Sequence, residues 1–489
     1  MSVSAGQAVV GGRGRSRASG LLVAIAAALL LAGCFGPNAL LAVLAAATFL
    51  AGSMLLWRPG QPPILLYVFL IQWLQASVVV FHATLAGASV DDFSTMQGNE
   101  TKAIVLTQLA LICQAVGLKL GAGAIKPGLM EGARDLAQRT PLRRWFGAYL
   151  VFAMVSAAAA FAASRAPGLS QVLGGVGYLR WAFFFMLAFA FFARGSLRNP
   201  LFYIAFAAEL LAGLGGYFSD FKTAFIVTLL GLVASGTRVS ARFIAVSAAI
   251  SAAALFLMVV WSAVKEDYRD FVSGGQAEQV VTVEYGERMK QLGALVGQLD
   301  AESLGQGADT LVRRISYVDY FGVVVDRVPS QLPYQNGAIL RDAILRPFTP
   351  RLLFPGKSAI DDSLRTRQFT GMHVASAAEG TSIGVGWPAE LYIDFGPWLM
   401  MPVALALGLA YGFVQRFFLN WRYSAGLLGL AISIEILLAA ASIETSITKM
   451  IGGLMAGFIA AWLVARFAMP GLLPWLTGRG RQGAERAAQ

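Results

Sequence analysis

Charged side chains are scarce in this sequence. Asp, Glu, Lys and Arg make up 13% of its 489 residues, and the mean hydropathy is +0.64. Soluble domains carry roughly 25% charged residues, so this composition excludes a soluble globular protein and places the chain in a lipid bilayer. The net charge of +11 then reflects orientation in the membrane, and no nucleic acid is expected as a partner.

Cysteine and the common catalytic motifs are also nearly absent. Cys34 and Cys113 both lie in or at the edge of apolar stretches, which leaves no disulfide framework and no metal-ligand spacing. The chain has no Gly-rich phosphate loop, no HExxH and no GxSxG. It therefore lacks these signatures of phosphate binding, zinc peptidases and serine hydrolases, and we expect neither a metal nor another cofactor.

Long apolar runs dominate what is present. Runs of about 20 residues can each cross the hydrocarbon core of a bilayer. We predict twelve spans: 19–36, 38–56, 63–84, 103–122, 146–164, 177–193, 200–217, 222–236, 243–264, 392–415, 424–446 and 448–469. The stretch LLLAGC, which ends at Cys34, also fits a lipoprotein signal peptide. A first transmembrane helix is favoured because a second apolar run follows at once.

The positive charges in the short connecting loops predict the topology. Arginines concentrate in every second loop and in both tails, which places both termini in the cytoplasm of a multi-pass protein of the bacterial inner membrane. The chain then divides into a cytoplasmic tail, spans 1–9, a periplasmic loop, spans 10–12 and a basic cytoplasmic tail, at residues 1–18, 19–264, 265–384, 385–469 and 470–489. The predicted fold is an all-α polytopic membrane protein with about 12 transmembrane helices and a large, partly helical periplasmic loop between spans 9 and 10.

The loop 265–384 is close to neutral, with 13 Lys and Arg against 15 Asp and Glu, so a basic site in it requires local clustering. Helical periodicity predicts helices within 283–299 and 307–328. After Pro333, prolines at 347, 350 and 355 predict extended or turning backbone. A long ordered loop between helices is typical of a lid or a binding element.

Several ionisable residues fall at the outer ends of the predicted spans, where they indicate a site on the outer face. Glu209 and Glu435 lie deeper, near the middle of spans seven and eleven. They fit a proton path in a transporter, or structural hydrogen bonds between helices.

Three short motifs resemble a known family. SDFKTAF (219–225) opens a helix, PRLLFPGK (350–357) lies in the large loop, and ELYIDFG (390–396) enters the next span. Together they resemble the bacterial oligosaccharide repeat-unit polymerases, the Wzy-type or O-antigen polymerase family, over about residues 215–415. The resemblance implies an inverting, metal-independent glycosyl transfer at the periplasmic face, from a polyprenyl-diphosphate-linked glycan onto a lipid-linked repeat unit.

The resemblance also assigns roles to residues. The lipid diphosphate that leaves needs cations, and the expected set is Lys222, Arg269, Arg314, Arg351 and Lys357. The base for the acceptor hydroxyl is expected to be Glu390, then Asp220, then His373, although Glu390 also fits a residue that orients an arginine. Tyr317, Tyr320 and Tyr392 are expected to stack on sugars. Alternatively, the loop 348–362 is a structural lid whose basic groups meet lipid headgroups.

The implied partners are the lipid-linked donor and acceptor, membrane lipids, a flippase and a chain-length regulator. The nearest alternative is an O-antigen ligase, which uses the same donor but has lipid A-core as its acceptor. A twelve-span secondary transporter is less favoured because the two halves show no matching repeats. A lipid-phosphate-sugar glycosyltransferase would carry its acidic pair in the first outer loop, whereas Asp91 and Asp92 lie in the second.

Overall fold

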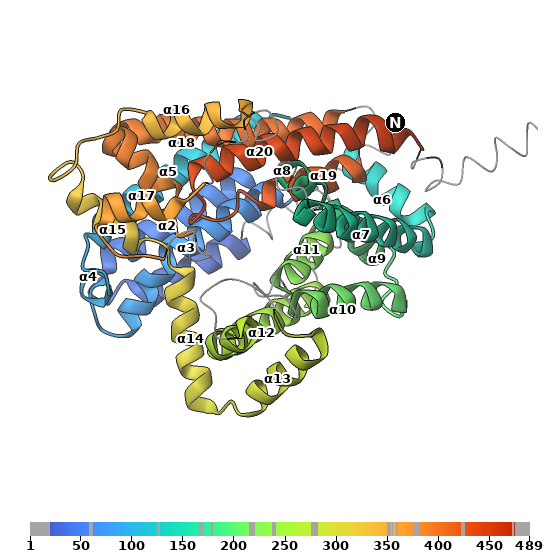
Figure 1. Ribbon diagram of the computed structural model, residues 1–489, viewed down its shortest axis with the longest axis horizontal. Helices are drawn as coiled ribbons and strands as arrows, with labels where there is room; N and C mark the ends of the chain where they lie inside the picture. Colours follow the sequence, from blue (N-terminus) through green and yellow to red (C-terminus); the bar gives the residue numbers. More distant parts are fainter. Residues whose placement is uncertain are drawn as a thin grey trace, which may run out of the picture.

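The computed structural model describes most of the chain as helices (Figure 1). The described residues are 20–57, 62–124, 128–165, 170–177, 179–214, 221–236, 241–274, 282–349, 354, 356–357, 360–375, 382–421, 426–471 and 474. Within these ranges no strand occurs, which confirms the predicted all-α class.

Within the described ranges, seven helices are long and apolar enough to cross a membrane, which indicates a membrane-embedded protein. They are α2 (Ala39–Leu56), α3 (Ile64–Leu85), α5 (Glu100–Ala122), α7 (Leu142–Arg165), α12 (Ala241–Ser273), α18 (Trp387–Asn420) and a helix from Ile447 to Gly471 that begins with α20 (Ile447–Leu463). Shorter apolar helices are Gly20–Gly33, α9 (Leu179–Ala193), α10 (Pro200–Leu214), α11 (Phe221–Ala234) and α19 (Leu427–Leu438). These twelve helices coincide with the twelve predicted spans, but five are short, so the number of crossings stays a prediction.

Glycines allow α5 and α18 to pack backbone against backbone. A Cβ atom added to Gly117 of α5 would lie 2.1 Å from the carbonyl oxygen of Leu405 on α18. In return, a Cβ atom on Gly408 of α18 would lie 2.1 Å from the carbonyl oxygen of Gln114 on α5. Gly121 and Gly412 repeat the arrangement one turn later. Small residues at this spacing are typical of closely packed transmembrane helices, so we call these four residues the glycine seam.

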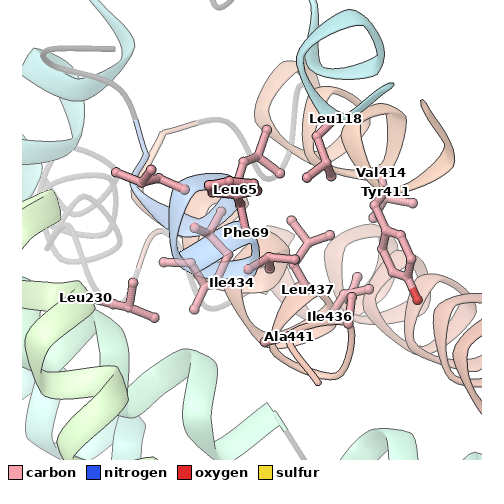
Figure 2. Close-up of a cluster of buried hydrophobic side chains, with 14 of the residues drawn as sticks. Leu65, Phe69, Leu118, Leu230, Tyr411, Val414, Ile434, Ile436, Leu437 and Ala441 are labelled. Carbon is pink, nitrogen blue, oxygen red and sulfur yellow. The ribbon is translucent and has the colours of Figure 1, made fainter. Parts of the chain in front are cut away.

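The main hydrophobic core surrounds this helix pair. Figure 2 shows side chains of α3, α11, α18 and α19 meeting in it, among them Phe69, Leu230, Tyr411 and Leu437. All four are nearly or fully buried. The core therefore joins helices from both ends of the sequence.

A second hydrophobic cluster lies where α13 (Tyr285–Gly297), the helix before α14 (Ala301–Ile315), packs against α11 and α12. It includes Phe225, Trp261, Tyr268 and Leu292, from α11, α12 and α13. Figure 1 shows α13 and α14 at the lower edge of the molecule, with α14 rising toward α15 (Asp319–Arg327). These helices thus connect the C-terminal end of α12 to the main bundle.

The segment after Pro333 is more helical than its prolines predict. It forms α16 (Ala338–Leu345), a short 3-10 helix η2 (Arg346–Phe348) and α17 (Asp362–Thr370). The prediction of extended or turning backbone was wrong for α16 and α17, which flank the prolines, whereas Pro350 and Pro355 lie outside the described residues. Asp394 of α18 accepts hydrogen bonds from the N–H groups of Ile339 and Leu340, and so caps α16 from a distant part of the chain.

The two helices predicted earlier in the loop have different outcomes. The helix predicted within 283–299 is α13. The pattern at 307–328 instead forms parts of two helices, because residues 316–318 break it between α14 and α15. The remaining described helices are α4 (Val90–Phe93), α6 (Leu129–Arg139) and α8 (Ser170–Gly177).

Candidate functional site

Glu390 is fully buried in the first turn of α18. One carboxylate oxygen accepts a hydrogen bond from the guanidinium of Arg365. The other accepts one from the backbone N–H of Ile447, the first residue of α20, at 2.6 Å. A carboxylate at a helix N-terminus satisfies an otherwise unpaired N–H group and complements the helix dipole. Glu390 therefore joins α17, α18 and α20 at one point.

A second ion pair lies beside the first. The Lys449 ammonium of α20 is 2.6 Å from a carboxylate oxygen of Asp362 on α17, and it also donates to the Ser382 hydroxyl at 3.1 Å. Arg365, Glu390, Asp362 and Lys449 are called the ionic cluster below.

In the ionic cluster, nearby carboxylates balance the positive charges. Burial lowers the pKa of Arg365, but the negative charges of Glu390, Asp362 and Asp342 together raise it by more than burial lowers it. The net shift of this pKa is therefore upward. Arg365 therefore stays charged, and its charge is already balanced by carboxylates. A diphosphate would need additional cations.

Two glutamines of α3 fix the turn that precedes α20. The Gln75 side chain accepts from the N–H of Ile443 at 2.8 Å, and the Gln72 amide donates to the carbonyl of Ala440 at 2.8 Å. The Trp387 indole donates to Gln72 at 3.2 Å. The N-terminus of α20 is thus held in place on the α3 side as well as by Glu390.

Tyr317 connects the junction of α14 and α15 to the ionic cluster. Its hydroxyl donates to the carbonyl of Gly384, just before α18. Burial raises the pKa of Tyr317 well above its usual value, and the negative charges of Glu444, Asp362 and Glu390 raise it further. The phenol therefore remains a hydrogen-bond donor close to these carboxylates.

The three predicted sugar-stacking tyrosines are not equivalent. The rings of Tyr317 and Tyr320 lie together, with centroids 5.7 Å apart, and both residues are half-buried. Tyr392 is buried against Phe321 and donates to the carbonyl of Val328. Tyr317 and Tyr320 are therefore exposed enough to contact a ligand, whereas Tyr392 is too buried to stack on a sugar.

Three cations gather where α12 meets α14. Lys265 is half-buried, with the positive charges of Arg314 and Arg269 nearby and the carboxylate of Glu266 opposing them. Among the described residues, neither Lys265 nor Arg314 has a carboxylate within ion-pair distance. We call Lys265, Arg269 and Arg314 the basic cluster. Arg314 is three residues from Tyr317, so their Cα atoms are at most about 11 Å apart.

The other predicted site residues lie on separate elements or outside the described residues. Lys222 is exposed on the first turn of α11. The Lys357 ammonium donates to the carbonyls of Arg346 and Thr349. His373 is exposed just after α17. Asp220 and Arg351 lie outside the described residues.

The sequence interpretation did not select Arg365 or Asp362 for the site. It counted Lys265 among the ionisable residues that indicate a site on the outer face, but gave it no role. Asp361 is the N-cap of α17, and its side chain accepts a hydrogen bond from the N–H of Ser363. The Asp-Asp-Ser sequence at this point is typical of a helix start, so it could have predicted the helix that carries Asp362 and Arg365. Lys265 stands one turn before Arg269 on α12, a spacing that places both on one helix face.

Glu209 has structural partners inside the bundle. The Tyr149 hydroxyl of α7 donates to it at 2.9 Å, and Arg180 of α9 is 3.7 Å from its other oxygen. Of the two interpretations given for Glu209, these contacts favour hydrogen bonding between helices. Glu435 of α19 has no ion pair or hydrogen bond with a described residue.

A comparison with family models matches residues 62–420 to a family described as "Domain of unknown function (DUF8712)". The match covers more than half of the chain, and the chain belongs to this family. It includes α3, α14–α18 and all members of the two clusters except Lys449. No curated protein and no solved structure matches the chain.

Proposed function

We propose that this protein is a polysaccharide polymerase of the bacterial inner membrane. In this proposal it crosses the membrane twelve times, with both termini in the cytoplasm and residues 265–384 at the periplasmic face. It transfers a polyprenyl-diphosphate-linked glycan onto a lipid-linked repeat unit without a metal. The motif resemblance over residues 215–415 supports this assignment, and the basic cluster is the structural observation that carries it.

The basic cluster suits a diphosphate leaving group. Like charges held together repel one another, and an anion bound between them would relieve the repulsion. Arginine presents paired N–H groups that match phosphate oxygens, and such groups stabilise charge that develops in a transition state. Arg269 and Arg314 then hold the diphosphate, with Lys265 as a third cation.

The glycosyl transfer step also needs a base for the acceptor hydroxyl and residues that contact the sugar. The acceptor hydroxyl oxygen attacks the anomeric carbon, the bond from this carbon to the diphosphate oxygen breaks, and the hydroxyl proton passes to a base. Glu390 is sealed from solvent with both oxygens occupied, so we assign it to positioning Arg365 and α20. His373 and Asp220 stay predictions for the base, and Tyr317 and Tyr320 stay predictions for contact with the sugar.

The proposal is tested by removing the basic cluster in cells. Arg314→Ala combined with Arg269→Ala should reduce polymer at least tenfold, at matched protein abundance, because the leaving group loses two arginines. Lipid-linked single repeat units should accumulate. Lys290→Ala on the neighbouring α13 is the control, because this lysine is exposed and lies outside the cluster. Normal polymer ladders from the double variant would overturn the assignment.

The same cells separate a polymerase from a ligase. Loss of a polymerase leaves one repeat unit on the final acceptor, whereas loss of a ligase leaves none. An acceptor without any repeat unit would therefore move the assignment to the ligase while keeping the diphosphate site.

A further inference from the structure

The C-terminal half of α16 and the 3-10 helix η2 expose large apolar side chains. Ile344, Leu345 and Phe348 are 45%, 57% and 67% exposed, respectively. On the opposite side, Ile339 and Ala343 are buried against the bundle. The exposed side also carries two charged residues at its start, Arg341 and Asp342, and Asp342 lies 3.9 Å from Arg346. Beyond them, the apolar side chains at 344, 345 and 348 are left largely uncovered by the described residues.

The packing of α16 shows how it lies relative to the spans. Asp394, which caps its N-terminus, is one turn further along α18 than Glu390, the residue that contacts the start of α20. Both α16 and η2 contact α20. Figure 1 shows α16 running alongside α18 and α20, with its axis in nearly the same direction.

This arrangement fixes the direction of α16. An eight-residue helix is about 12 Å long. The 3-10 helix η2 follows its C-terminal end and still contacts α20. The chain therefore runs from the capped end of α16 down the side of α20, toward the middle of that span.

The neighbouring surface of α18 also exposes large apolar side chains. Trp398 and Leu399, just past the bend at Gly396, are 81% and 62% exposed on a helix long and apolar enough to cross a membrane. When large apolar side chains are exposed on a membrane-spanning helix, they are in contact with lipid. The exposed face of α16 and η2 continues a lipid-facing surface already present on the helix it packs against.

Polar backbone groups at this depth need partners, because lipid offers none. The Lys357 ammonium donates to the carbonyl oxygens of Arg346 and Thr349, which follow the end of α16. Asp394 satisfies N–H groups at the other end. Both ends of the element are thus supplied with hydrogen-bond partners from the protein.

We propose that α16 and η2 form a re-entrant element inserted into the acyl chains of the leaflet on the side of α17. Ile344, Leu345 and Phe348 contact phospholipid acyl chains, and the exposed charges of Arg341 and Asp342 lie at the level of the headgroups. Lys357 stabilises the turn of this element. The inference concerns the membrane position of residues 338–348 and does not depend on the proposed enzyme activity.

Spin labels test the proposal in lipid nanodiscs. Leu345→Cys and Phe348→Cys, made in a background of Cys34→Ser and Cys113→Ala, would carry a nitroxide label. Collisions of each label with oxygen, which dissolves in lipid, are compared with collisions with a water-soluble nickel chelate. Phe256→Cys on α12 is the lipid reference and Glu302→Cys on α14 is the water reference, since both residues are exposed.

Labels at 345 and 348 should resemble the label at 256, with an oxygen-to-nickel ratio several-fold above that at 302. A ratio equal to that at 302 would place the element in water and overturn the proposal. Because cysteine variants can misfold, the unaltered protein provides a second measurement. A phospholipid with a photoactivatable acyl chain should cross-link to a peptide that contains residues 338–348, and cross-links confined to other spans would also overturn it.

Discussion

Each oxygen of the Glu390 carboxylate contacts a different element, which makes this residue sensitive to shape as well as to charge. Arg365 of α17 contacts one oxygen, and the N–H of Ile447 contacts the other. Glutamine has a single acceptor oxygen, so Glu390→Gln turns an amide group toward one of two donors. Alanine removes both acceptors and leaves Arg365 without its closest counter-charge.

We therefore expect graded losses at this position. Glu390→Gln should lower the free energy of unfolding by about 1–3 kcal/mol, the cost of an unsatisfied buried donor. Glu390→Ala should lower it by about 3–5 kcal/mol, the range for breaking a buried ion pair. Thermal unfolding in detergent measures both, with Glu444→Gln as an exposed control in the preceding turn. A melting temperature for Glu390→Ala equal to that of the wild type would contradict this account.

Asp319, the first residue of α15, should make stability depend on pH. Burial raises the pKa of Asp319, and the positive charge of Arg313 offsets part of that effect. Its folded-state pKa is therefore higher than its unfolded value, and the native state holds the proton more tightly. Stability then falls as pH rises from the unfolded pKa of about 3.9 through the folded pKa.

Asp319→Asn removes this titration. The variant should lose less stability than the wild type as pH rises above about 4, and should be the more stable protein at neutral pH. Melting temperatures between pH 4 and pH 8 provide the measurement. Asp326→Asn, exposed on the same helix, is the control. Parallel curves for wild type and Asp319→Asn would show that this carboxyl has no such effect.

Among the elements, α5 and α18 depend most on the glycine seam. Gly408→Ala would place a methyl group 2.1 Å from a backbone oxygen, so the two helices must separate. We expect this variant to be clearly less stable in detergent, while Gly453→Ala on α20, where nothing lies within 4 Å, should not be. Equal melting temperatures for these two variants would mean that the helices do not pack so closely in the membrane.

At this scale the sequence predicts much of the structure, because apolar length and helical periodicity are local properties. The twelve apolar helices and α13 follow from them. The helix α16 does not, because its cap is Asp394, more than 50 residues away in sequence. The ionic cluster was missed for the same reason: Glu390 was recognised at the entrance to α18, but no local pattern pairs it with Arg365 on α17.

For the whole molecule, the positive-inside pattern makes a prediction that the helices alone do not test. Reporter fusions after residues 130 and 485 should be active in the cytoplasm, and a fusion after residue 330 should be active in the periplasm. Full-length protein made at equal levels is the control for each fusion. A cytoplasmic signal from the fusion at 330 would reverse the topology and would place both clusters on the other side of the membrane.

The glycine seam also has a consequence for synthesis. Roughly 260 residues separate α5 from α18, and ribosomes add about 5–20 residues each second. The face of α5 that carries Gly117 and Gly121 therefore waits for tens of seconds in the nascent protein before its partner exists. During that interval the open face must be covered by lipid, by another nascent helix or by an insertion factor. Chains that terminate before α18 would carry it permanently uncovered, as a ready target for membrane proteolysis.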